Sequence, residues 1–195
     1  MSPARTCTAA LTGVDAHLIE VEADIASGLP ATVLTGLPDT SLRETRDRVR
    51  AAIVNSGEGW PHTKITVSLS PAALPKRGGA FDLAVAVAVL AAAGAVPPSG
   101  PDDRMLFLAE LGLDGRLRPV PGVLPAVAAA AADGIGTVVV HAANAAEAAQ
   151  IPNVQVVPAL ALADVAAWLR GGPAPPHEDP DVGRGTSHAP RRGRR

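Results

Sequence analysis

The chain has 195 residues, of which 47% are hydrophobic and only 2% aromatic, so its core must be built from small aliphatic side chains. The formal net charge is −2, which gives no electrostatic footprint for nucleic acid. The single cysteine, Cys7, excludes an internal disulfide framework and a cysteine-based zinc site. The N-terminus lacks an apolar signal region, and the longest apolar run, Leu83–Val96, is shorter than the ~20 residues that span a bilayer. We expect a soluble, cytoplasmic protein with no membrane partner.

The first part of the chain predicts two paired strands and a third short strand. Arg5–Leu11 and His17–Ile25 alternate with the two-residue period of half-buried strands. Gly13–Ala16 supplies turn residues between them, which predicts a hairpin. Leu18 breaks the parity of the second strand, which allows a bulge or a register change there. Ala31–Gly36 is the third predicted strand.

The strongest local signal predicts a helix that starts at Ser41. Ser41 and Glu44 form a capping box, apolar residues follow at helical spacing, and Ser56-Gly57 closes the helix. Its other face carries Arg43, Arg46, Asp47, Arg48 and Arg50. We interpret this face as solvated and held by i,i+4 pairs, with a surface for a partner or for phosphate groups as the alternative.

The middle of the chain predicts a strand followed by a buried helix. Lys64–Leu69 is the strand, and the breaker-rich segment 70–79 is a loop. Phe81–Ala93 is apolar on every side except at Asp82, so this helix is expected to be buried. Asp82 stands near the helix start, where a carboxylate complements the helix dipole, and we therefore interpret it as a capping residue.

The last part of the chain alternates strands with short helices. The predicted elements are a hairpin over Met105–Val120 with a type I′ turn at Asp114-Gly115, a helix over Gly122–Asp133, a strand over Thr137–His141, a helix over Asn144–Gln150 capped by Asn144, a strand over Val154–Val157 and a helix over Leu160–Leu169. Beyond Arg170 the sequence is rich in Pro, Gly and charges. We therefore expect an ordered domain over 1–170 and a disordered tail or linker over 171–195.

Motifs for catalysis are absent from the sequence. There is no phosphate-binding loop, and Pro75–Gly79 has glycines and cations in the wrong order, with no Ser or Thr after them. No G-x-S-x-G elbow occurs, and no two of the five histidines are four residues apart. Cys7 lies in a predicted strand and is interpreted as a buried, unreactive thiol. The residues show no recognisable nucleophile, general base or metal cluster.

Five segments in one order carry a family resemblance. They are Thr35–Asp39, Arg43–Ile53, Ile65–Ala72, Gly79–Leu83 and Glu110–Gly115. Together they resemble the N-terminal domain of the YifB/ComM group of magnesium-chelatase-like AAA+ ATPases, over about Thr6 to Leu169. In that family this domain resembles the proteolytic domain of Lon, which implies an α+β sandwich with a ribosomal-protein-S5-domain-2-like fold.

The resemblance to Lon implies where a catalytic dyad would stand. Lon-type peptidases use a serine nucleophile activated by a lysine. In the segment that matches the serine loop, Pro75–Asp82, Ala80 stands at the nucleophile. In the segment that matches the lysine, Val120–Pro125, Leu124 stands at the base. The resemblance therefore implies a peptidase-like scaffold that is not an enzyme.

The family also implies a larger machine. Its members resemble ATP-driven hexamers with an AAA+ motor that binds ATP and Mg, and the ComM branch is associated with DNA branch migration during natural transformation. We expect this chain to be a non-catalytic accessory or assembly domain without the motor, in a truncated, frameshifted or short form. It needs no cofactor of its own, and its expected partners are the AAA+ module or further copies of the chain.

Two alternatives stay open at this point. One is a nucleic-acid-binding module that uses the arginine-rich tail or the residues Arg43, Arg46, Arg50, Lys76 and Arg77, with DNA as a partner. The other is a Ser/Lys peptidase that uses Ser70 with Lys76, although no third residue orients that pair.

Overall fold

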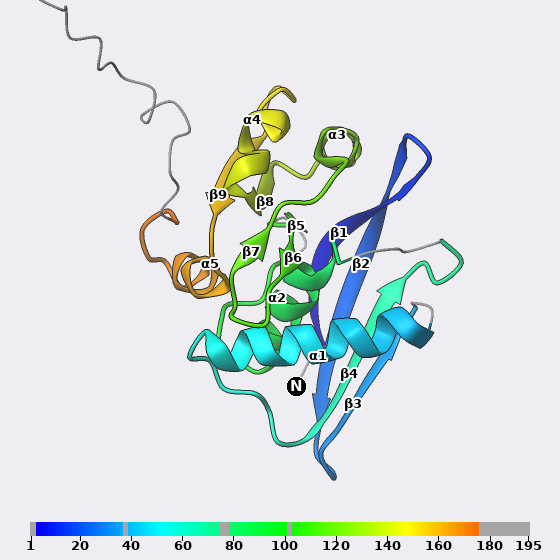
Figure 1. The fold of residues 1–195 in the computed structure, drawn as a ribbon, viewed down its shortest axis with the longest axis vertical. Helices are drawn as coiled ribbons and strands as arrows, with labels where there is room; N and C mark the ends of the chain where they lie inside the picture. Colours follow the sequence, from blue (N-terminus) through cyan, green and yellow to red (C-terminus); the bar gives the residue numbers. More distant parts are fainter. Residues whose placement is uncertain (1–2, 37–38, 75–78, 101–102, 176–195) are drawn as a thin grey trace, which may run out of the picture.

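The computed structural model describes residues 3–36, 39–74, 79–100 and 103–175. Its centre is a seven-stranded mixed sheet in the order β3-β4-β2-β1-β5-β8-β9 (Figure 1). The strands of this sheet are β1 (Ala4–Thr12), β2 (Asp15–Ala26), β3 (Ala31–Thr35), β4 (Lys64–Ser70), β5 (Met105–Leu108), β8 (Thr137–His141) and β9 (Gln155–Ala159). The strands β6 (Glu110–Leu111) and β7 (Leu117–Arg118) form a separate two-stranded ribbon. The helices are α1 (Asp39–Asn55), α2 (Asp82–Ala92), α3 (Val123–Ala132), α4 (Ala145–Ala148) and α5 (Leu162–Leu169), with a 3₁₀ turn η1 at Ala142–Asn144.

Helix α2 lies between the sheet and α1, which explains its composition. It contacts β1 and β2 on one side and α1 on the other, and every residue from Asp82 to Ala92 is buried. The buried helix predicted from the sequence is confirmed. The mixed sheet with helices packed on it agrees with the predicted sandwich of helices and sheet. The assignment to a Lon-like and S5-like fold stays a prediction.

The two faces of the sheet support two apolar clusters. Ile19, Val21 and Ala23 of β2 belong to the cluster that includes α2, which fills the α1/α2 face. The opposite face holds a smaller cluster in which α3 packs on β1, β5 and β8. This second cluster covers only part of its face, so the remainder of that side of the sheet is open.

The first hairpin is regular throughout. The register between β1 and β2 is unbroken from Ala4 opposite Ala23 to Thr12 opposite Asp15, so there is no bulge at Leu18. Leu18 breaks the parity because it points to the second face, where it packs against the cluster under α3.

The segment predicted as one hairpin over Met105–Val120 is divided between two sheets. Its first residues form β5 between β1 and β8 of the main sheet, and only the short strands β6 and β7 pair as a ribbon. The type I′ turn is also wrong. The bonds Gly112 N to Arg116 O (2.8 Å) and Gly115 N to Gly112 O (3.0 Å) enclose a three-residue loop that ends at Gly115 with φ 82°. A left-handed third residue is typical of such loops.

Two predicted helix caps differ from the structure. α1 begins at Asp39, so Ser41 lies inside the helix and not at its cap. Asn144 makes no capping bond to α4; its side chain instead accepts from Val120 N and donates to Val120 O, both at 3.0 Å. Asn144 therefore ties the start of α4 to the segment that enters α3.

The other strands and helices of the second half of the chain were predicted correctly within two residues. No helix in the described ranges has both the length and the apolarity needed to cross a membrane. The predicted tail lies outside the described residues from 176 onward.

Candidate functional site

The two positions of the expected dyad carry apolar side chains in different settings. Ala80 is half-buried just before α2 and packs against the second apolar cluster, to which Val120 and Val123 also belong. Leu124 lies in the first turn of α3, also half-buried, and its N–H donates to Glu147 Oε1 at 2.9 Å. Neither side chain can act as a nucleophile or as a base. Whether they correspond to the serine and lysine of Lon stays a prediction.

A buried carboxylate, that of Asp82, forms an ion pair with Arg48. The Arg48 guanidinium donates from Nε to Asp82 Oδ2 at 2.8 Å and from Nη2 to Oδ1 at 3.2 Å. Leu111 N donates to the same Oδ2 at 3.3 Å, and Arg48 Nη2 also donates to Thr45 Oγ1 at 3.4 Å. Asp82 is fully buried. One carboxylate thus joins α1, α2 and the β6–β7 ribbon.

The position of Asp82 in the core changes its acidity. Burial raises the pKa of Asp82 to about 6, while its bonds to Arg48 and Leu111 N oppose this rise and the charge of Glu110 adds to it. The hydrogen bond to Asp82 in turn raises the pKa of Arg48. The sequence reading of Asp82 as a cap and of Arg48 as a solvated residue is therefore wrong, because the two residues satisfy each other.

The segments that carry the family resemblance meet one another. A Cβ on Gly36 would overlap the carbonyl oxygen of Leu69, so the first segment approaches the third at backbone distance. A Cβ on Gly79 would meet the side chain of Glu110 at 2.6 Å. A Cβ on Gly115 would lie 3.2 Å from Ala52 O of α1. These glycines allow neighbouring segments to approach closely, and the motif residues around them hold elements of the fold together.

The arginines of α1 divide into two groups. Arg48 is committed to Asp82, whereas Arg43, Arg46 and Arg50 lie on one stripe of the helix. Arg46 pairs with its neighbour Asp47 at 3.0 Å. Arg43 and Arg50 are exposed and have no ion-pair partner among the described residues. Lys76 and Arg77, which the sequence analysis placed with them, lie outside the described residues.

A small pocket of about 240 Å³ adjoins this stripe. Arg46 and Arg50 line it together with Trp60, His62 and Thr63. The hydroxyl oxygen of Thr63 is buried and has no hydrogen-bond partner within the described residues. The arginines of this stripe were predicted from the sequence as a candidate binding surface. The aromatic, imidazole and hydroxyl groups that the fold brings beside them were not predicted.

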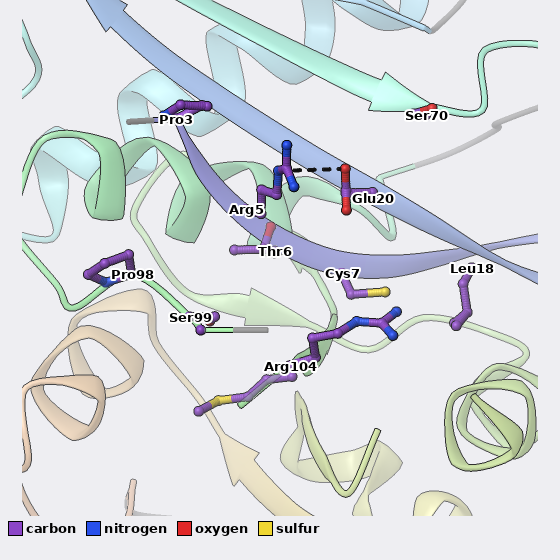
Figure 2. A pocket seen from close by; sticks show the side chains of 12 residues that line it. Pro3, Arg5, Thr6, Cys7, Leu18, Glu20, Ser70, Pro98, Ser99 and Arg104 are labelled. Carbon is purple, nitrogen blue, oxygen red and sulfur yellow. Dashed lines mark ion pairs between the residues drawn. The ribbon is translucent and has the colours of Figure 1, made fainter. Parts of the chain in front are cut away.

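A larger pocket of about 760 Å³ lies on the open part of the second sheet face (Figure 2). It is formed by the first residues of β1, the middle of β2 and the loop that leads into β5. Arg5, Cys7 and Arg104 are among its lining residues. Cys7 is buried, as predicted, and burial raises the pKa of its thiol while Arg104 opposes the rise. Within the described ranges, no group of three or more His, Cys, Asp and Glu lies close enough together to hold a metal ion.

The fold that holds these sites is a mixed α/β domain. The family model described as subunit ChlI of Mg-chelatase matches residues 21–144, most of the described body. The chain belongs to this magnesium-chelatase-like family, as an N-terminal domain of its YifB/ComM group, which confirms the resemblance found in the sequence.

Three relatives illustrate the match. The chain is 48% identical to the uncharacterized protein Rv2897c of Mycobacterium tuberculosis, 43% identical to the uncharacterized protein YifB of Salmonella typhimurium and 39% identical to the competence protein ComM of Haemophilus influenzae. Each alignment covers 171 residues, or 88% of this chain, but only 33 to 34% of the relative. The chain thus spans about a third of the length of these relatives.

Proposed function

We propose that this domain is a non-catalytic accessory and assembly module of a magnesium-chelatase-like AAA+ ATPase that works in the cytoplasm. The observation that supports the proposal is that Ala80 and Leu124, the positions to which the resemblance to Lon assigns the serine and the lysine, both carry apolar side chains. An alanine methyl cannot attack a carbonyl, and a leucine cannot accept a proton. The scaffold therefore offers surfaces without peptidase chemistry.

The use of the family motifs supports the same proposal. Arg48, Asp82 and Leu111 come from three different motif segments and are joined by hydrogen bonds to the buried Asp82 carboxylate. If the motifs served catalysis, we would expect polar groups from them to converge on an open pocket. Their polar groups instead converge between α1, α2 and the β6–β7 ribbon, where they fix the relative positions of these elements.

Under this proposal, the ATP-dependent activity of the family belongs to the AAA+ module. ATP and Mg would bind the AAA+ module, and this domain would contact that module or other copies of itself in a hexamer. The name of the Haemophilus influenzae relative associates that protein with competence. We extend this to the present chain by proposing that it supports DNA remodelling through assembly.

Assembly is tested by mixing the full chain with the part of Rv2897c that lies outside the matched region. Light scattering after size exclusion should detect a complex, and the ATPase rate of the partner should change on its formation. Separate elution at micromolar concentration, with an unchanged ATPase rate, would remove the basis of the proposal.

Peptidase activity is tested with the chain alone. Neither turnover of a fluorogenic protein substrate nor labelling by a serine-reactive fluorophosphonate is expected. Labelling that disappears in Ser70→Ala would instead support the Ser/Lys alternative, because Ser70 is exposed at the end of β4.

A nucleic-acid-binding module is the second candidate function. It is favoured by the stripe of Arg43, Arg46 and Arg50 beside the pocket that contains Trp60, since guanidinium groups with an aromatic side chain are typical of single-strand binding. A gel-shift titration should show an affinity that falls steeply with salt and weakens in Arg50→Gln. An affinity that is unchanged in Arg50→Gln would remove the α1 face from this function.

A further inference from the structure

The open part of the second sheet face contains a cavity to which the proposed function assigns no role. The pocket of about 760 Å³ falls within the range of about 300–1,000 Å³ that small-molecule sites occupy. α3 covers the neighbouring part of the same face, where the second apolar cluster lies. The pocket therefore begins where that cluster ends.

The floor of the pocket is formed by paired strands. Cys7 of β1 lies opposite Glu20 of β2, and Glu20 lies opposite Ser70 of β4, so these three side chains point to the same side of the sheet. The loop residues Pro98–Gly100 form a wall. Groups placed on strands within a sheet are held more precisely than groups on loops, which favours a preformed site.

Two arginines supply positive charge to the pocket. Figure 2 shows the Arg104 side chain reaching toward Cys7 and the Arg5 side chain lying beside Glu20. Arg104 pairs with Asp133 at 2.8 Å, and Arg5 pairs with Glu22 at 3.2 Å and with Glu20 at 3.8 Å. All five of these side chains are at least one-third exposed, and exposed ion pairs contribute only about 0–1 kcal/mol. Either guanidinium can therefore exchange its present partner for a bound anion.

The rest of the lining is largely apolar. Leu18, Pro98 and Met105 line the pocket beside the arginines. The Cys7 thiol adds a small uncharged group, because burial raises its pKa and keeps it protonated near neutral pH. Among the lining residues two cationic side chains face one anionic side chain, Glu20, although the chain as a whole has a net charge of −2.

We propose that this pocket binds a small organic anion with an apolar body. Its carboxylate, sulfonate or phosphate group pairs with Arg104 and Arg5, and its apolar body lies against Leu18 and Met105. Binding sites of this kind combine an apolar lining with a few polar groups that fix orientation. The site is separate from Ala80 and Leu124, and it does not depend on the assembly role.

Binding is tested on the full chain with 1-anilinonaphthalene-8-sulfonate, a fluorescent aryl sulfonate. We expect saturable binding at one site, with a Kd that rises about tenfold in Arg104→Gln, the loss of about one charge-assisted hydrogen bond. Arg116→Gln removes the same charge from an exposed residue that does not line the pocket, and it should leave the Kd unchanged. Equal weakening in both variants, or no saturable binding, would overturn the proposal.

A second readout is competition with the probe. Hexanoate should displace the probe from the wild-type chain, whereas hexanol at the same concentration should not. This comparison stays decisive if Arg104→Gln does not fold, because it needs no variant. Displacement by hexanol equal to that by hexanoate would exclude recognition of the anionic group, and displacement by neither would overturn the proposal.

Discussion

The buried carboxylate of Asp82 gives the sharpest test of the energetics of this domain. Asp82→Asn keeps the size of the side chain and one oxygen acceptor but removes the group that takes up a proton. The carboxyl has a pKa of about 6 in the fold, against an ordinary value of 3.8. Because the folded value is the higher one, the native state binds the extra proton, so the contribution of Asp82 to stability is fully present below pH 4 and is lost as the pH rises through 6.

The size of this effect follows from the two pKa values. One pKa unit corresponds to about 1.36 kcal/mol, so the shift of Asp82 is equivalent to about 3 kcal/mol. No correction for solvent screening is needed, since the side chain is fully buried. Because the unfolded carboxyl is itself partly protonated at pH 4, the wild-type chain should gain somewhat less than this, about 2 kcal/mol, relative to Asp82→Asn when the pH is lowered from 7 to 4.

Urea unfolding of both proteins at pH 7 and at pH 4 measures this difference. Comparison with the variant cancels the titration of the other carboxylates, and Asp47→Asn serves as a matched control because Asp47 is mainly exposed. If the wild type instead lost stability relative to Asp82→Asn on acidification, Arg48 and Leu111 N would hold the pKa of Asp82 below 3.8, and burial would not be the dominant effect.

Three further substitutions test the packing. Arg48→Met should lower the free energy of unfolding by about 3 kcal/mol at pH 7, because it leaves the buried Asp82 carboxylate without its cation. The loss should be smaller at pH 5, where that carboxyl group is protonated, and urea unfolding at the two pH values measures both losses. Gly36→Ala should lower the melting temperature more than Gly134→Ala, because both glycines have a positive φ (90° and 80°) but only at Gly36 would a Cβ overlap a backbone atom, the carbonyl oxygen of Leu69; equal losses would exclude the overlap. Asn144→Leu should lower the free energy of unfolding in urea by about 2 kcal/mol, because it leaves the buried N–H and C=O of Val120 unpaired. A loss below about 0.5 kcal/mol, which is the size expected for a neutral surface substitution, would contradict this role.

Much of the fold could be predicted because its strands and helices obey simple periods. Residues Ile65, Val67 and Leu69 alternate in sequence, and all three are buried in β4. α2 has no polar stripe, and it is the helix enclosed between the sheet and α1. Such patterns show which residues are buried, and the period at which buried residues recur distinguishes a strand from a helix.

The polar pairs could not be predicted in the same way. Arg48 and Asp82 are 34 residues apart, and Asn144 and Val120 are 24 apart. A capping reading of Asp82 and Asn144 is favoured by local sequence, because both stand at helix starts. The fold supplies stronger partners from distant segments, so tertiary contacts replaced the local bonds. The same limit applies to the two pockets, whose lining residues come from several segments.

The residues that carry the family resemblance therefore have a different role from the residues of the candidate sites. A Cβ on Gly36 would overlap the carbonyl oxygen of Leu69, and a Cβ on Gly79 would meet the side chain of Glu110 at 2.6 Å, so at both glycines one motif segment lies directly against another. The Arg48–Asp82 ion pair joins the motif segments of α1 and α2. The residues that identify the family are those that hold α1, α2 and the ribbon together. A function that differs among members of such a family would be expected in the exposed arginine stripe or in the open pocket, where side chains can change without disturbing these contacts.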